Sequence, residues 1–169
     1  KPKMDLSKLD PWRFSMDAMV GTKMTEGRLG IRKARHDLDF LWEHAFEHAE
    51  YEFDVQWSRL IDFNSKTLAG VRSGNSPEQY DRFYLGYNQP LPFLRQGTAT
   101  MDHEAELRLG LSKELSLTNH ISWSSEIQYE SDGKWELKTG LDYRLTKEFA
   151  TVLRYHSDHQ LGFGLRIYF

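Results

Sequence analysis

The sequence of 169 residues contains no cysteine, which excludes disulfide bonds, thiol catalysis and thiolate metal sites. It also lacks any apolar run approaching the roughly 18 residues that a membrane-spanning helix needs. Charge of one sign is not in large excess, because 22 Lys and Arg residues stand beside 25 Asp and Glu residues. That balance indicates neither a nucleic-acid-binding surface nor an acidic tail. No signal peptide is visible, and the start "KPKMDLSKLD" is what processing or trimming would leave.

What the chain does contain is many aromatic side chains at a low mean hydropathy. Aromatic residues make up 14% of the sequence, while the mean hydropathy is -0.66. This combination is unusual for a soluble domain with an apolar core. It is expected where apolar residues occupy only one face of many strands.

The second half alternates between apolar and polar side chains with a period of two, which predicts β-strands. The pattern runs through "TMDHEAELRLGLS", "NHISWSSEIQYE", "KWELKTGLDYRL", "FATVLRYH" and "QLGFGLRIYF". Polar turn sequences such as "ESDGK" and "HSDHQ" separate these stretches. The segments are therefore expected to pair consecutively as an antiparallel meander.

The first half is less regular. Residues 36–50, "HDLDFLWEHAFEHAE", fit either a strand or an amphipathic helix, and the flanking strands favour a strand. Residues 64–98 hold Gly, Asn, Ser and three of the five prolines, which predicts a long excursion with a short hairpin around "RFYLGY".

The patterns predict eight strands. Ten is the alternative, if 28–45 is divided into two strands and 80–88 is counted as a strand of its own. The eight are 12–24, 28–45, 49–63, 99–112, 118–130, 134–145, 148–157 and 159–169. Closure removes exposed sheet edges, so the expected fold is an all-β, closed, antiparallel up-and-down barrel in a single domain.

Three features favour an outward apolar face and a polar lumen, and they make the expected fold a transmembrane β-barrel. The polar face carries both signs of charge, which can fill a narrow barrel as a paired network. Aromatic residues gather near strand ends, as in the girdles of a membrane barrel. The long 64–98 excursion lies opposite the chain termini, as an outer loop would. The expected lumen network comprises Asp17, Glu52, Asp54, Glu104, Glu106, Arg108, Glu126, Lys138, Asp142, Arg144, Arg154 and Arg166. The two expected girdles comprise Trp12, Phe14, Tyr51, Tyr143, Phe149, Tyr168 and Phe169 on the side of the termini, and Phe63, Tyr129, Trp135 and Tyr155 on the other.

The final stretch, "QLGFGLRIYF", resembles the C-terminal assembly signal of bacterial outer-membrane barrels. The signal has a polar residue, a glycine two positions later, apolar positions two apart and a terminal aromatic. Gln160, Gly162, Leu165, Ile167 and Phe169 meet it. The strand layout resembles the small-barrel class that includes the membrane domain of outer-membrane protein A and OmpX. The resemblance implies recognition by the barrel assembly machinery, and that loss of Phe169 impairs assembly more than stability.

Small outer-membrane barrels include lipid A-modifying enzymes and proteases, so the resemblance makes the histidines candidates for catalysis. The stretch "HSDH" places His156, Asp158 and His159 at one hairpin, where an acid–base pair could form. His103 is expected on a lipid-facing stripe. The alternatives are a solvated turn and an interfacial histidine, and we predict no metal site and no cofactor.

The expected function is a structural, adhesive or partner-binding role in the bacterial outer membrane, through the outer excursion and with the lumen plugged. Tyr80, Phe83, Tyr84 and Tyr87 are the predicted partner-binding residues, because exposed aromatics make adaptable contacts. Expected partners are outer-membrane lipid, lipopolysaccharide, the assembly machinery and a protein at the outer loops, with no nucleic acid. Two alternatives stay open: a lipid A-modifying or proteolytic barrel enzyme, and a soluble lipid-carrier barrel with its apolar face inward.

Overall fold

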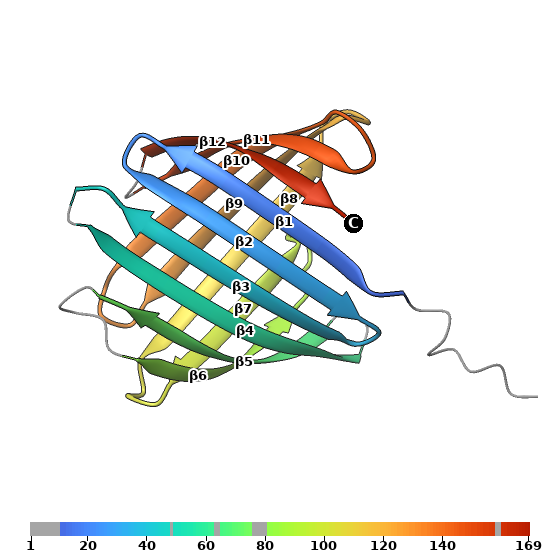
Figure 1. The fold of residues 1–169 in the computed structure, drawn as a ribbon. Coiled ribbons are helices and arrows are strands. Elements are labelled where there is room, and N and C mark those ends of the chain that lie inside the picture. Colours follow the sequence, from blue (N-terminus) through green and yellow to red (C-terminus); the bar gives the residue numbers. More distant parts are fainter. Residues whose placement is uncertain (1–10, 48, 63–64, 76–80, 158–159) are drawn as a thin grey trace, which may run out of the picture.

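The chain forms a closed β-barrel in the computed structural model, which describes residues 11–47, 49–62, 65–75, 81–157 and 160–169 (Figure 1). The described residues contain twelve strands, each antiparallel to the next along the chain. The strands are β1 Arg13–Gly21, β2 Met24–Lys33, β3 His36–Ala45, β4 Glu50–Asp62, β5 Ser65–Gly74, β6 Arg82–Gln89, β7 Gln96–Asp102, β8 Leu107–Ser116, β9 Ile121–Glu130, β10 Trp135–Arg144, β11 Phe149–His156 and β12 Gln160–Tyr168.

The first and last strands close the barrel. β1 pairs with β12 from Ser15 opposite Tyr168 to Gly21 opposite Gly162. Beyond them, the backbone N–H of Phe169 donates to the carbonyl of Phe14 at 2.9 Å. Figure 1 shows the blue first strand and the red last strand side by side. Closure therefore pairs each of the twelve described strands on both sides.

The two ends of the barrel are defined by where the turns lie. We call the end at which β1 begins and β12 finishes the terminal end, and the opposite one the distal end. Turns 34–35, 90–95, 117–120 and 145–148 lie at the terminal end, and turns 22–23, 103–106 and 131–134 at the distal end. The expected closed up-and-down architecture is thus confirmed.

The expected number of strands is wrong. The predicted strand 28–45 is divided between β2 and β3 by a turn at 34–35, and 99–112 is divided between β7 and β8 by residues 103–106. Neither turn contains Gly or Pro. Instead Ala34 and Ala105 adopt positive φ angles of 53° and 65°, in the region that usually favours glycine. Turns made by such residues have little sequence signature, so the sequence predicted one long strand in place of each of these two hairpins.

The long outer excursion predicted over 64–98 is also wrong. β5 and β6 lie within it, and they pair with each other and with β4 and β7. The outward side chains of β5 are small, Thr67, Ala69, Val71 and Ser73, so its alternation has little apolar contrast. The ambiguous segment 36–50 forms β3 and the start of β4, which confirms the strand interpretation.

Apolar side chains cover the outside of the barrel and polar ones face the lumen. Outward side chains such as Leu85 and Phe163 are 70% and 58% exposed, whereas the inward Met24 and Ser58 are each 2% exposed. An exterior of this kind suits lipid and a polar interior suits water, as in transmembrane barrels. The soluble-carrier alternative is therefore wrong, because it required the opposite arrangement. No helix among the described residues is long and apolar enough to cross a membrane.

Aromatic residues lie near both ends, although not all on the expected side. The rings of Trp12 and Phe14 stack at the terminal end, and those of Tyr129 and Trp135 lie 5.0 Å apart at the distal end. Tyr51 was expected at the terminal end, but it begins β4 at the distal end, because the extra strand reverses the direction of the chain there. Phe63 is outside the described residues, and the girdles themselves stay a prediction.

Candidate functional site

A cavity of about 920 Å³ occupies the lumen. Its lining extends from Lys134, in a turn at the distal end, to Arg95, in a turn at the terminal end, and includes residues of every strand except β11. The cavity therefore runs along the whole barrel. Eight strands leave an interior that side chains just fill, and the diameter grows with strand number. The predicted plug by charged side chains does not fill the lumen, because a cavity of about 920 Å³ remains between the side chains that line it.

One group of ion pairs lies at the seam where the barrel closes. Arg166 on β12 donates through Nε to Asp17 on β1 at 2.8 Å and through Nη1 to Asp142 on β10 at 2.6 Å. Arg154 on β11 donates to Glu26 on β2 at 3.0 Å and lies 3.6 Å from Asp17. These contacts join β10, β11 and β12 to β1 and β2 across the seam, so they stabilise the closed barrel.

A second group lies beside the seam, nearer the distal end. Lys138 Nζ on β10 is 3.3 Å from Glu136 on the same strand and 3.8 Å from Glu43 on β3. His156 Nε2 on β11 lies 2.6 Å from Glu136 Oε1, and this side chain is only 7% exposed. Because β3 and β10 are not neighbours in the sheet, the contact between Lys138 and Glu43 reaches over the interior. It narrows the lumen at this level.

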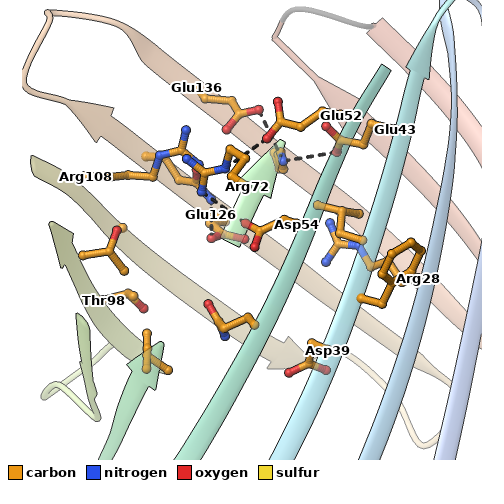
Figure 2. Close-up of a pocket in the computed structure, with 18 of the residues that line it drawn as sticks. Arg28, Asp39, Glu43, Glu52, Asp54, Arg72, Thr98, Arg108, Glu126 and Glu136 are labelled. Carbon is orange, nitrogen blue, oxygen red and sulfur yellow. Dashed lines mark hydrogen bonds and ion pairs between the residues drawn. The ribbon is translucent and has the colours of Figure 1, made fainter. Parts of the chain in front are cut away.

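Arg72 is the centre of a third group, on β4, β5 and β6. Figure 2 shows its guanidinium beside Glu52 and Asp54, whose carboxylates lie 3.0 and 3.1 Å away. The hydroxyl of Tyr84 donates to Asp54 at 2.6 Å, and its ring lies across Gly70. A Cβ atom at Gly70 would come within 2.3 Å of that ring, so only glycine leaves room for it. The small residue on β5 therefore positions the tyrosine that holds Asp54.

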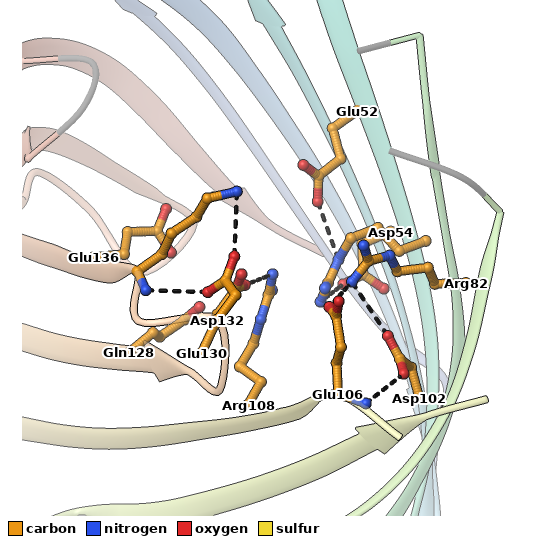
Figure 3. Close-up of polar contacts among 12 residues, drawn as sticks. Glu52, Asp54, Arg82, Asp102, Glu106, Arg108, Gln128, Glu130, Asp132 and Glu136 are labelled. Atoms are coloured by element: carbon orange, nitrogen blue, oxygen red, sulfur yellow. Dashed lines mark hydrogen bonds and ion pairs between the residues drawn. The ribbon is translucent and has the colours of Figure 1, made fainter. Parts of the chain in front are cut away.

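The distal opening carries two further cation–carboxylate contacts (Figure 3). Arg82 on β6 contacts Asp102 at 3.3 Å and also contacts Glu106 in the turn that follows β7. Arg108 on β8 contacts Glu130 on β9. The wall formed by β6 to β9 is thus charged at its distal end.

Asp132 organises the turn between β9 and β10 at this opening. The backbone N–H of Lys134 donates to its Oδ1 at 3.0 Å, and this hydrogen bond lowers the pKa of the Asp132 carboxyl. The Lys134 ammonium lies 3.3 Å from the other oxygen. The carboxylate therefore stays ionised and holds the short turn.

The terminal half of the lumen has fewer ion pairs and more neutral polar groups. Asp37 on β3 accepts from Arg32 at 2.7 Å and also from Lys66. The amide of Asn88 donates to the Thr98 hydroxyl at 2.9 Å. Neutral amide and hydroxyl groups of this kind can hydrogen-bond to water or to polar solutes.

Most of the predicted lumen residues lie on the lumen wall. Nine are on strands with their side chains inward: Asp17, Glu52, Asp54, Arg108, Glu126, Lys138, Asp142, Arg154 and Arg166. Glu104 and Glu106 were expected on a strand but lie in the turn 103–106, where only Glu106 contacts an arginine. Arg144 is exposed at the terminal end of β10.

Sequence reasoning missed about as many lumen residues as it found. The additional ones include Glu26, Arg28, Asp37, Asp39, Glu43, Lys66, Arg72, Arg82, Asp102, Glu130 and Glu136. Several lie in segments that were read as one long strand or as a loop. The alternation of charge in "EGRLGIRK" was the available signal, since every second residue from Glu26 faces the lumen.

The structure describes only two of the four candidate catalytic residues, His103 and His156. His103 lies in the turn after β7 rather than on a lipid-facing strand, and its Nδ1 accepts from the backbone N–H of Phe83 at 3.3 Å. His156 is on the lumen wall beside Glu136. Asp158 and His159 lie outside the described residues. Within the residues that are described, no group of three or more His, Cys, Asp or Glu side chains could hold a metal ion.

The predicted partner-binding residues belong to a strand and not to an outer loop. Phe83 and Tyr87 point outward from β6 and are 61% and 43% exposed, whereas Tyr84 points inward and is 6% exposed. Tyr80 is outside the described residues. The alternation of β6 therefore separates residues that the sequence suggested would form one surface.

The residues of the predicted assembly signal lie along β12. Leu165 and Ile167 face outward opposite Ala18 and Met16 of β1. Gly162 faces inward under the side chain of Met19, and Gln160 adopts a positive φ of 63° at the start of the strand. Phe169 follows the strand and pairs through its backbone with Phe14. Recognition by the assembly machinery stays a prediction.

Comparison with known proteins relates this chain to others through its fold. No protein-family model matches it, and no curated protein matches its sequence. Among solved structures it is similar to the KdgM porin in complex with disordered oligogalacturonate, with a TM-score of 0.60 and 14% identity over 92% of this chain and 98% of that one. It is also similar to the outer membrane protein Omp33 of Acinetobacter baumannii, with a TM-score of 0.53 and 10% identity over 95% of this chain and 97% of that one. The NanC porin has a TM-score of 0.50 and 10% identity over 94% of this chain and 98% of that one.

These similarities define an outer-membrane, porin-like barrel fold. At such low identities the likeness shows the fold alone. The expected outer-membrane location agrees with these neighbours. The eight-stranded class named from the sequence is wrong, because this barrel has twelve strands among its described residues.

Proposed function

We propose that the chain forms a water-filled channel in the bacterial outer membrane, through which small hydrophilic solutes diffuse. The observation that carries this proposal is the polar cavity in the lumen, whose lining residues extend from Lys134 at one end of the barrel to Arg95 at the other. It lies inside a barrel whose exterior is apolar, so water and solutes would enter the lumen while lipid surrounds the wall. The fold shared with the KdgM and NanC porins supports it.

The barrel wall suggests how the channel would select by size. Ion pairs between non-neighbouring strands, such as Lys138 with Glu43, extend over the interior. They leave a cavity much smaller than the aqueous channel of a 16- or 18-stranded porin. We therefore expect conduction of inorganic ions and passage of small polar solutes rather than of folded proteins.

Conductance across a planar lipid bilayer tests the proposal. Gln56 faces the lumen from β4 and lines the cavity, while the preceding residue, Val55, faces outward and is 38% exposed. A Gln56→Trp variant should lower the single-channel conductance by about half or more, because a bulky ring enters a lumen of limited diameter. The matched variant Val55→Trp adds its ring on the lipid side and should conduct like the wild type.

Two results would contradict the channel. Folded wild-type protein that is inserted but carries no current would do so, as would equal loss of conductance in both tryptophan variants. Heat-modifiable mobility on gels confirms beforehand that each variant is folded.

The other expected roles are further proposals, each supported by fewer observations than the channel. Binding of a protein partner at the distal turns, contact with lipopolysaccharide and recognition of residues 160–169 by the assembly machinery are compatible with a channel. No specific observation in the described residues favours the enzyme alternative over it.

A further inference from the structure

The cationic side chains of the lumen are all engaged by carboxylates. Each Arg and Lys side chain that lines the cavity contacts at least one Asp or Glu side chain. Arg72, Lys138 and Arg166 each contact two. Among the residues that the structure describes, no Arg or Lys side chain therefore faces the cavity without a carboxylate in contact.

The carboxylates are not all engaged in return. Asp39 on β3 and Glu126 on β9 line the cavity, and neither contacts a cation among the described residues. Glu126 accepts a hydrogen bond from the neutral amide of Gln128 at 2.8 Å. Figure 2 shows both side chains in the cavity. Arg144, the unpaired arginine at the end of β10, is exposed at the terminal end and does not line the cavity.

These two carboxylates lie on opposite walls. Going round the barrel in either direction, β9 is six strands from β3. A solute that moves along the lumen therefore meets, on each side, a carboxylate that no cation contacts among the described residues. A paired cation and carboxylate produce a field that falls off quickly, whereas an unpaired charge acts over several ångströms in a narrow lumen with a low-dielectric wall.

We propose that the channel prefers small cations to anions, and that Asp39 and Glu126 are residues that determine this preference. Carboxylates facing a pore raise the local concentration of cations and repel anions, as acidic side chains do in cation-selective channels. The inference rests on the proposed channel function and adds to it the charge class of the permeating solute.

Reversal potentials in a KCl gradient test this inference. For the wild type we expect a K⁺ to Cl⁻ permeability ratio above 1, and for Asp39→Asn/Glu126→Gln a ratio reduced toward 1 by about twofold or more, since two facing charges are removed. Both substitutions are close in size to the residue they replace, so the lumen keeps its width.

A matched control removes one charge outside the cavity. Glu148 lies in the exposed turn between β10 and β11, where it accepts from the Thr146 hydroxyl. Glu148→Gln should leave the permeability ratio unchanged.

The outcomes separate the two proposals. A wild-type channel that conducts but prefers anions, or a double variant with an unchanged ratio, would overturn the inference and leave the channel function standing. A folded, inserted barrel without conductance would overturn the channel function and this inference with it.

Discussion

Replacing Arg166 should destabilise the barrel more than replacing any exposed lumen arginine. Its guanidinium makes hydrogen bonds of 2.8 and 2.6 Å to Asp17 and Asp142, and all three side chains are only 16 to 17% exposed. Hydrogen bonds to charged groups contribute about 1.5 to 3 kcal/mol each, and removing one partner leaves a buried charge uncompensated. Asp17 keeps Arg154 at 3.6 Å, and water in the lumen screens the remaining charges. We therefore expect Arg166→Met to lower the free energy of unfolding by about 2 to 4 kcal/mol.

The assay is urea unfolding of the barrel in lipid vesicles, followed by tryptophan fluorescence. Arg32→Met is the matched control, because Arg32 makes a single contact with Asp37, is 59% exposed and leaves Asp37 paired with Lys66. Exposed ion pairs contribute roughly 0 to 1 kcal/mol, so this control should change stability by less than about 1 kcal/mol.

A third variant distinguishes loss of an ion pair from loss of packing. Adding Asp17→Asn and Asp142→Asn to Arg166→Met removes the two carboxylates that have lost their arginine, and it should restore part of the free energy of unfolding. Equal destabilisation by Arg166→Met and Arg32→Met, or no recovery in the triple variant, would refute the reasoning.

Two further predictions concern the wall. Tyr84→Phe removes the hydrogen bond to Asp54 but keeps the ring over Gly70, so it should lower the free energy of unfolding by about 0.5 to 1.5 kcal/mol in the same assay. Gly70→Ala displaces the ring and should lower the free energy of unfolding further. A Gly70→Ala variant as stable as Tyr84→Phe would contradict this. Val55→Lys puts a charge on the lipid face in the middle of β4 and should cost about 2 to 4 kcal/mol, while Gln56→Lys on the lumen face should cost clearly less. If the two lysine variants are equally stable in lipid vesicles, the assignment of the two faces is incorrect.

Local patterns identified the strands with strong contrast between their faces. In β12 every second residue is apolar, and in β10 Thr139 is the one exception. The ends of both strands were predicted to within one residue. The same patterns failed where the contrast is low, as in β5, and where turns use alanine at positive φ, as at Ala34 and Ala105. A two-residue period says which face a residue takes, but it does not say where one strand stops and the next begins.

The number of strands then decided the character of the lumen. Eight strands would have left an interior filled by side chains, while the twelve observed leave a cavity of about 920 Å³. Four hairpin boundaries that the sequence did not reveal thus changed the expected function from a plugged scaffold to a channel.

By itself, the sequence determined that apolar side chains would cover one face of many antiparallel strands and charged ones the other, because alternation is a local property of an extended chain. Only the tertiary structure decided which charges meet. Arg166 finds Asp17 across 149 residues and Arg154 finds Glu26 across 128, since barrel closure and register place them together. Asp39 and Glu126 face the cavity without a cation in contact among the described residues. Which cation contacts a carboxylate depends on its neighbours in the closed barrel and not on its neighbours in the chain.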